Sequence, residues 1–227
     1  MCCDLTQTPL FQGIDPQELD SLLQCLGTRR RSFRRGETIL QEGQPTEVIG
    51  VVLSGMAVME YQDFQGVNSV LGSAHPGMVF GEAYACIPSE PLLISVRAAE
   101  DTEVLFLNVG RVLTTCPNSC GFHARLVRNL LTVCAAKNLE LSRRALHTTS
   151  KTIRGRLLSY FSECAKRAGQ DCFTLPYNRQ QLADYLNLDR SALCSELSKM
   201  QRDGLLRYQK NQITLLHRAA GAEVPKI

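Results

Sequence analysis

The stretch NRQQLADYLNLDRSALCSELSKMQ, residues 178–201, decides the fold, because it contains two short helical periods separated by a turn. Asn178, with Gln181 three residues later, has the pattern of an N-cap and its capping-box partner. In the turn, Asn187 stands where the chain needs a positive φ, which asparagine tolerates better than other non-glycine residues. The apolar face of the first period consists of Leu182, Ala183, Tyr185 and Leu186. The stretch therefore predicts a helix-turn-helix.

The second period predicts a helix with two different faces. Asp189 is placed to cap it, and its apolar positions are Leu193, Leu197 and Met200. The second helix of a helix-turn-helix enters the DNA major groove with its N-terminal side chains at the base edges. We expect Arg190 to contact a base, guanine above all, beside Ser191 and Ser195, while phosphates are contacted by Lys199 and Arg179. Small helical bundles also contain two helices and a short turn, so this pattern alone leaves DNA binding open.

Two further runs favour DNA binding. Residues 205–208 and 213–216 read as strands separated by the polar turn 209–212, and Gly204 before them suits the end of the second helix. Together with the two helices they predict a winged helix-turn-helix.

Composition and charge indicate a cytoplasmic protein of two domains. The 227 residues carry a net charge of +3, divided as −8 over residues 1–110, +9 over 111–170 and +2 over 171–227. Basic charge thus begins just before the helix-turn-helix, as phosphate binding requires. No signal peptide is recognisable, and no apolar run reaches the roughly 18 residues of a membrane span. Ten scattered cysteines without an export signal indicate a reducing compartment rather than a disulfide framework.

The first half of the chain reads as a short helix followed by a β structure. Asp15 and Pro16 mark the N-cap and first position of the helix, which continues to Leu26. Short β runs punctuated by glycines then follow, and Pro76-Gly77 is the strongest turn signal. These runs are residues 38–40, 48–53, 57–61, 67–71, 79–80, 94–98 and 104–107. They predict an antiparallel barrel or roll.

Three motifs in this region carry a resemblance to a known family. GETILQEG at 36–43, VVLSG at 51–55 and PGMVFGE at 76–82 resemble, in order and spacing, the β roll of the cyclic-AMP receptor protein and fumarate-nitrate regulator (Crp/Fnr) family. The likeness extends over about residues 10–216. It implies an α+β fold with a cyclic-nucleotide-binding-like sensory roll (1–116), a long dimerisation helix (117–147) and a winged helix-turn-helix domain (148–227). It also implies a homodimeric transcription regulator on an inverted-repeat operator, with RNA polymerase and a small-molecule effector as further partners.

The segment between the two domains supports a dimer on its own pattern. Residues 118–145 contain no proline and no glycine after Gly121. Spacings of four and three connect Val127, Leu131, Cys134, Asn138, Leu141 and Ala145. This is the seam of a coiled coil, in which Asn138 would fix the register. The alternative is an exposed asparagine on a helix packed against its own β roll. Thr148-Thr149-Ser150 reads as the hinge, and residues 151–168 as the next helix.

The effector loop departs from the resemblance. Cyclic-AMP-binding members have an arginine for the phosphate and a hydroxyl neighbour after the Gly-Glu pair. Here Gly81 and Glu82 are kept, but Leu92 and Leu93 align with the arginine and its neighbour. Arg97 matches a strand position. We therefore expect no response to cyclic AMP and no cofactor, with Glu82 lacking a cation opposite it and the pocket either empty or suited to a less polar ligand.

Two other functions remain open from the sequence. Three thiols and an imidazole at Cys86, Cys116, Cys120 and His123 would make a zinc or iron set for metal or redox sensing. Against it, Pro117 interrupts the helix start, and the N-terminal cysteine cluster of the fumarate-nitrate regulators is absent. The other alternative is a small-molecule-binding protein that no longer binds DNA, which Arg190 and the basic segment argue against. No catalytic motif indicates an enzyme.

Overall fold

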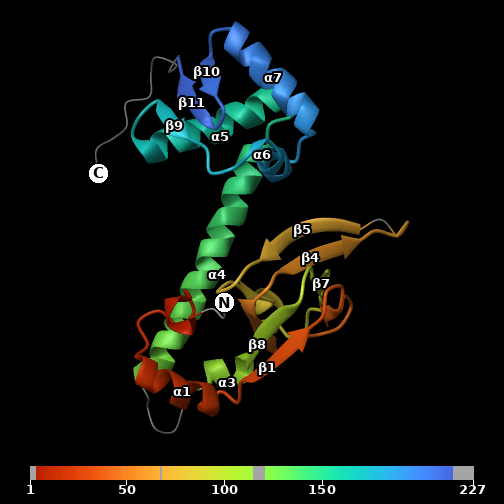
Figure 1. The fold of residues 1–227 in the computed structure, drawn as a ribbon, viewed down its shortest axis with the longest axis vertical. Coiled ribbons are helices and arrows are strands. Elements are labelled where there is room, and N and C mark those ends of the chain that lie inside the picture. The colour runs from red at the N-terminus through yellow and green to blue at the C-terminus, as the bar shows by residue number, and fades with distance from the viewer. Residues whose placement is uncertain (1–3, 67, 115–120, 217–227) are drawn as a thin grey trace. The chain divides into compact units, whose positions relative to one another are not determined.

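The computed structural model describes residues 4–66, 68–114 and 121–216. The chain forms two compact units, Met1–Lys137 and Asn138–Ile227, and the division falls inside one long helix. The first unit is built on antiparallel sheets and the second on a helix-turn-helix (Figure 1). This confirms the α+β fold class that the sequence predicts.

The N-terminal unit consists of two four-stranded antiparallel sheets with helices at one end (Figure 1). The sheets have the strand orders β1-β8-β3-β6 and β2-β7-β4-β5. Their strands are β1 (Arg29–Phe33), β2 (Thr38–Leu40), β3 (Val48–Ser54), β4 (Ala57–Gln62), β5 (Asn68–Ala74), β6 (Val79–Phe80), β7 (Ser95–Ala98) and β8 (Thr102–Asn108). The helices are the 3-10 turn η1 (Leu5–Gln7), α1 (Pro16–Cys25), α2 (Glu82–Ala85), α3 (Val109–Leu113) and α4 (Gly121–Thr148), whose last residues belong to the second unit.

Buried side chains of both sheets pack together in the interior of the roll. Phe33, Val52 and Phe80 come from one sheet, and Ala57 and Val96 come from the other. Gly50 makes room for this packing, because a Cβ atom at that position would lie 2.2 Å from the ring of Phe80. A second cluster packs α1, α3 and the first half of α4 against β3 and β8.

Strand β1 was not predicted, because its sequence RRRSF lacks the alternation of apolar and polar residues that marks a half-buried strand. It is an edge strand that pairs with β8 from Arg29↔Phe106 to Phe33↔Thr102, and only Phe33 is buried. Charged side chains are typical of exposed sheet edges, where they discourage pairing with other chains.

The C-terminal unit packs three helices on a small sheet. It contains α5 (Ile153–Ala168), β9 (Cys172–Thr174), α6 (Arg179–Leu186), α7 (Arg190–Arg202), β10 (Leu206–Gln209) and β11 (Gln212–Leu215). Strands β10 and β11 form the predicted wing, and β9 adds a third strand beside β11. The sequence analysis missed β9 because it is three residues long with only Phe173 buried. The core contains Leu157, Phe161, Leu182, Leu197 and Ile213.

Helix boundaries follow the predicted capping residues. Asp15 caps α1 with Pro16 at its start, as expected. Helix α5 begins two residues later than predicted, because the Thr152 hydroxyl accepts from the Gly155 amide as N-cap. Helix α4 continues to Thr148, one residue beyond the predicted end at 147 and into the predicted hinge, because His147 near its end is buried in the C-terminal unit.

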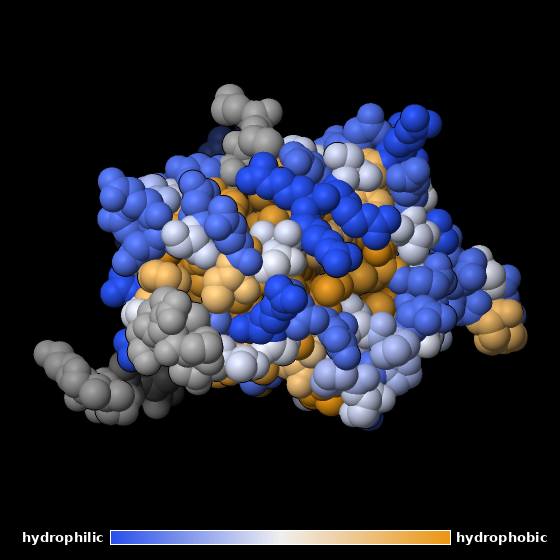
Figure 2. All heavy atoms as spheres, turned by 90° about the horizontal axis from the view of Figure 1, so that it is seen from below, coloured by the Kyte–Doolittle hydropathy of each residue, from blue (hydrophilic) through white to orange (hydrophobic). Residues whose placement is uncertain are grey.

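Among the described residues, no helix is both long and apolar enough to cross a bilayer. Seen from the end of the N-terminal unit at which α1 and α3 lie, most visible side chains are hydrophilic, with hydrophobic ones between them (Figure 2).

Candidate nucleic-acid interface and effector site

The helix-turn-helix is held by a cap at each of its three critical points. The Asn178 side chain accepts from the Gln181 amide and the Gln181 side chain accepts from the Asn178 amide, each at 2.9 Å, which completes the predicted capping box. Asn187 ends α6 in the left-handed region at φ 53°, as predicted. The Asp189 carboxylate accepts from the Ala192 amide at 2.9 Å and caps α7.

Helix α7 separates its two faces as the sequence predicts. Leu193, Leu197 and Met200 are fully buried in the C-terminal core. The outer face exposes Arg190, Ser191, Ser195 and Lys199. Arg190 and Ser195 make no hydrogen bond or ion pair with other side chains in the part of the chain that the structure describes. The Arg190 guanidinium, in the first turn of α7, is thus free to bind.

Two of the predicted DNA contacts are engaged within the protein. The Ser191 hydroxyl donates to the Asp189 carboxylate at 2.5 Å and is part of the helix cap. Arg179 donates from Nη2 to the Lys210 carbonyl at 2.7 Å, and its guanidinium lies 5.1 Å from the centre of the Tyr208 ring. Arg179 therefore supports the turn of the wing, while its Nη1 has no hydrogen-bond partner among the described residues, and its contact to phosphate stays a prediction.

The structure adds basic residues that the sequence analysis did not assign to the interface. Arg202 at the end of α7, Arg207 on β10 and Lys210 at the wing turn are all exposed. Their signal in the sequence was basic charge in the wing strands and in the last turn of the second helix. Lys199 is only loosely paired, since its Nζ lies 3.9 Å from the Glu196 carboxylate. These cations suit contacts to phosphate.

Helix α6 is anchored at its C-terminal end by two arginines from other helices. Arg144 of α4 donates to the carbonyls of Tyr185 and Asp184, both at 2.9 Å. Arg156 of α5 donates to the carbonyls of Leu186 at 3.1 Å and Asn187 at 2.9 Å. Cations at this end satisfy the free carbonyls and the negative pole of the helix.

A buried histidine anchors the end of α4 in the same unit. His147 Nε2 lies 2.5 Å from the Glu163 carboxylate and Nδ1 lies 3.1 Å from the Ser159 hydroxyl, both on α5. Its ring also meets that of Tyr160 edge-on, with 5.4 Å between the centroids. Burial raises the pKa of the Glu163 carboxyl, but hydrogen bonds from His147 and Arg167 outweigh burial and leave the pKa below its ordinary value.

The effector loop has a cation that the sequence analysis missed. Gly81 takes φ 76°, and Glu82 after it is buried. Lys137 of α4 donates to the Glu82 carboxylate at 2.9 Å and to the Val79 carbonyl at 2.6 Å. The expectation that Glu82 lacks a cation is therefore wrong. The second carboxylate oxygen, Oε2, is buried and has no hydrogen-bond partner among the described residues.

The two leucines of this loop point in different directions. Leu92 is 3% exposed and Leu93 is 66% exposed, so of the two leucines predicted at the pocket mouth only Leu93 faces solvent. Arg97 is engaged on its own sheet, where its Nε lies 3.5 Å from the Glu60 carboxylate. Neither leucine offers a charge or hydroxyl to a phosphate.

Both halves of the chain match known domain families. Residues 30–118 match the cyclic nucleotide-binding domain, and residues 155–220 match the Crp-like helix-turn-helix domain. The two domains stand in the order that the fold shows. The chain belongs to the Crp/Fnr family of transcription regulators.

Individual relatives agree with this assignment. The transcriptional activator protein FnrA of Stutzerimonas stutzeri is 21% identical over 94% of this chain and 87% of its own length. The cyclic AMP receptor protein of Thermus thermophilus is 32% identical over 100 residues, which are 44% of this chain and 45% of that protein. The chain thus matches less than half of this second relative's length.

Solved structures share the fold. CprK in complex with OCPA superposes with a TM-score of 0.64 at 17% identity, over 88% of this chain and 89% of CprK. The c-di-GMP-responsive regulator CLP of Xanthomonas campestris gives a TM-score of 0.55 at 20% identity, over 90% of this chain and all of CLP.

The proposed seam of this Crp/Fnr chain lies on an apolar, largely open face of α4. Leu131 is 69% exposed and Leu141 is 65% exposed. Val127 and Cys134 are half-buried against the N-terminal core, and Asn138 is exposed. Among the described residues, these two leucines leave most of their surface uncovered.

The candidate metal set is only partly within the described residues, since Cys116 and Cys120 lie outside them. Cys86 is exposed, and burial followed by the Glu82 charge raises the pKa of its thiol. His123 is buried, with Nε2 2.9 Å from the Val112 carbonyl and 3.1 Å from the Arg111 carbonyl. The described residues contain no group of three or more metal-binding side chains. A raised thiol pKa disfavours the thiolate that metals bind.

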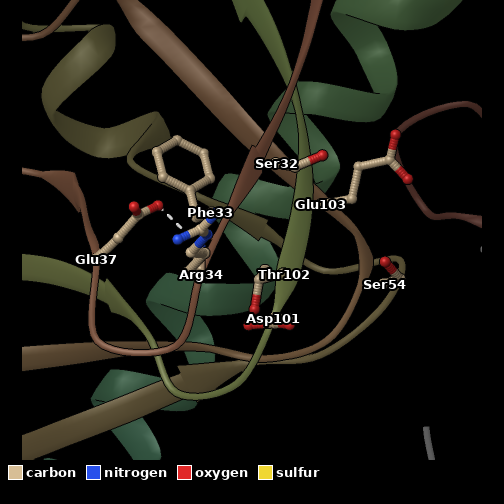
Figure 3. A pocket seen from close by; sticks show the side chains of 8 residues that line it. All are labelled: Ser32, Phe33, Arg34, Glu37, Ser54, Asp101, Thr102 and Glu103. Carbon is tan, nitrogen blue, oxygen red and sulfur yellow. Dashed lines mark hydrogen bonds between the residues drawn. The ribbon is translucent and has the colours of Figure 1, made fainter.

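A polar pocket of about 430 Å³ at the edge of the roll is distinct from the effector loop (Figure 3). Its lining side chains support turns: Glu37 accepts from the Arg34 amide at 2.8 Å, and Asp101 accepts from the Arg35 amide at 3.0 Å. It is lined by Ser32, Phe33, Arg34, Glu37, Ser54, Asp101, Thr102 and Glu103, so none of the predicted effector residues contributes to it.

Proposed function

We propose that this Crp/Fnr chain acts as a homodimer that binds an inverted repeat in double-stranded DNA, with α7 in the major groove. The observation that carries the proposal is the free Arg190 guanidinium in the first turn of α7, above a fully buried apolar face. An arginine in this position can donate two hydrogen bonds to guanine O6 and N7. Ser195 and Lys199 on the same face would extend the contact to a second base and a phosphate.

The open face of α4 supports the dimer. Burying an apolar side chain is worth about 25 cal/mol per Å² of surface removed from water, so a second copy of α4 would stabilise the exposed Leu131 and Leu141. A two-fold dimer presents two copies of α7, which explains why the operator would be an inverted repeat with half-sites about one helical turn apart. RNA polymerase remains an expected partner of the bound dimer.

We also propose that the protein does not respond to cyclic AMP. The lysine beside Glu82 is already paired with it, so a phosphate that used this lysine would have to compete with the buried Glu82 carboxylate. Burying the phosphate without a cation costs several kcal/mol. Leu92 supplies no compensation, and Leu93 faces solvent. Isothermal titration calorimetry at millimolar cyclic AMP should show no binding heat, and micromolar binding would refute this part of the proposal.

Selection of binding sites from a random DNA pool tests the main proposal. The full-length protein should enrich a sequence with two-fold symmetry, and mobility shift on the enriched site should show one dimer bound per site. Failure to enrich any sequence over several rounds would favour a protein that no longer binds DNA. Enrichment of a single half-site without symmetry would refute binding as a two-fold dimer but would still show DNA binding.

A further inference from the structure

A pocket of about 500 Å³ lies in the N-terminal unit, outside the roll. Its walls come from the N-terminal segment, the loop that leads into β6, and the first half of α4, and Figure 1 shows the N-terminal segment beside α4. Most of its surface is apolar and comes from Pro9, Pro76, Met78, Val79, Val133 and Ala136. A volume of about 300–1,000 Å³ with mainly apolar walls is typical of sites for small organic molecules.

Hydrogen bonds hold the walls of this pocket in place. Asn129 of α4 donates to the carbonyls of Leu10 at 3.0 Å and Gln12 at 2.9 Å, which ties the N-terminal segment to the helix. In the loop before β6, the Gly77 amide donates to the Val52 carbonyl at 2.8 Å, which joins the loop to β3. The pocket is therefore formed without a ligand, and a ligand would not have to order its walls.

Lys137 is the charged side chain of this pocket, whose other polar lining residues are Gln7, Thr8, Gln12, Asn129 and Thr132. Lys137 lines it, and its ammonium uses two of three N–H donors for the Val79 carbonyl and the Glu82 carboxylate. The remaining donor can serve a ligand acceptor. Because Glu82 already balances the lysine charge, the pocket gains little from a full negative charge on the ligand and favours an uncharged molecule.

The pocket would stay accessible in the proposed dimer. An α-helix turns by about 100° per residue, so Ala136, nine residues after Val127, lies on the opposite side of α4 from the seam. Val133 and Asn129 lie on the same side as Ala136, about one turn apart. A partner helix packed along Val127, Leu131 and Leu141 would not cover them.

We propose that this pocket is a binding site for a small, uncharged and mainly apolar organic molecule with one hydrogen-bond acceptor directed at Lys137. Such a molecule would contact α4, the N-terminal segment and the Pro76–Val79 loop at once. Loss or gain of these contacts would act on the helix that also carries the seam. The effect on DNA rests on the proposed function, whereas binding in the pocket does not.

Binding of N-phenyl-1-naphthylamine, an uncharged apolar fluorophore, tests the site on the full-length protein without DNA. The wild type should enhance its fluorescence with one molecule bound per chain. Ala136→Trp, which fills the pocket from its wall, should weaken binding by at least about tenfold, as expected when a ligand loses its cavity. Ala135→Trp is the matched control, since Ala135 is exposed on α4 outside the pocket, and it should change affinity by less than about twofold.

Three outcomes overturn the proposal: no binding by the wild type, equal loss in both tryptophan variants, or tighter binding of the anionic 8-anilinonaphthalene-1-sulfonate than of the neutral probe. Lys137→Met should weaken the neutral probe less than Ala136→Trp does, because the diarylamine nitrogen of the probe is a poor hydrogen-bond acceptor and the apolar walls remain. Mobility shift with and without the probe then measures separately how the probe changes the affinity for DNA. A protein that binds the probe but shifts no DNA, either with or without the probe, would contradict the proposed DNA binding and leave the site standing.

Discussion

Helices α4 and α7 are both amphipathic, but they differ in whether their apolar residues are buried within the chain. Helix α7 buries Leu193, Leu197 and Met200 in its own unit and exposes a polar face with Arg190. Helix α4 leaves Leu131 and Leu141 exposed. A helix that buries its apolar face within its own unit and exposes unpaired polar side chains suits a nucleic-acid partner. A helix that leaves apolar side chains exposed suits a protein partner. In the proposed function, α7 would recognise DNA and α4 the second subunit.

The largest effect should come from a charge placed on the exposed apolar face of α4. Leu131→Asp places a carboxylate in each half of a two-fold seam, and burying two unpaired charges costs several kcal/mol, which raises the dimer dissociation constant by at least about a hundredfold. Sedimentation velocity at micromolar protein should show monomers.

The matched control is Leu139→Asp, because Leu139 is also exposed on α4 but lies outside the seam spacing. It should leave the dimer intact. A wild-type protein that is monomeric at micromolar concentration and still binds its operator in full would show that α4 does not form the interface.

Truncating a leucine on the buried face of α7 should lower the stability of the C-terminal unit and leave dimerisation unchanged. Leu197→Ala leaves a cavity in the C-terminal core and should lower the free energy of unfolding of that unit by about 2–5 kcal/mol. Leu146→Ala, on an exposed leucine of the same unit, should change it by less than about 0.5 kcal/mol. Urea denaturation of both variants checks the contrast, and equal losses would mean that Leu146 is covered in the folded protein.

Removing the free guanidinium should affect only specific recognition. Arg190→Ala should cost about 1–3 kcal/mol on the selected operator and little on random DNA, because a base contact is lost and no protein contact breaks. Arg202→Ala, which removes an exposed cation at the other end of α7, should weaken both DNAs alike and reduce the salt dependence. Equal loss on both DNAs for Arg190→Ala would reduce it to a phosphate contact.

The smallest effect concerns the cap of α7. The hydrogen bond from Ser191, followed by that from the Ala192 amide, holds the pKa of the Asp189 carboxyl below its ordinary value. A folded pKa below the unfolded one stabilises the protein above the unfolded value, and this contribution is lost as pH falls through the folded pKa. Ser191→Ala should raise the pKa of Asp189 toward its ordinary value, measured by carboxyl NMR titration. An unchanged pKa would show that the hydroxyl does not bond the carboxylate in solution.

What could be predicted from the sequence follows from how far apart the interacting residues lie. The caps at Asn178, Asn187 and Asp189 depend on neighbours within four residues, so their patterns are visible in the sequence. The Lys137–Glu82 pair joins residues 55 apart, and no local pattern marks it. The hydrogen bond from Arg179 to the Lys210 carbonyl could not be predicted for the same reason, because the two residues are 31 apart.

The strands β1 and β9 were missed for a different physical reason. A strand is visible in the sequence when one face is buried and the other is not. Each of these two strands buries a single phenylalanine, Phe33 or Phe173, so there is no alternation to detect. Their place in a sheet is decided by pairing with β8 and β11, which lie far along the chain.

The arginines that hold the end of α6 determine where the DNA-binding half of the protein can be cut free. Arg156 belongs to α5, but Arg144 and the buried His147 belong to α4. A fragment that starts at residue 148 would contain the whole helix-turn-helix and lose both of these supports. A proteolytic or recombinant fragment that starts at Asn138 retains both supports, so a cut at the division between the two units keeps the end of α6 anchored.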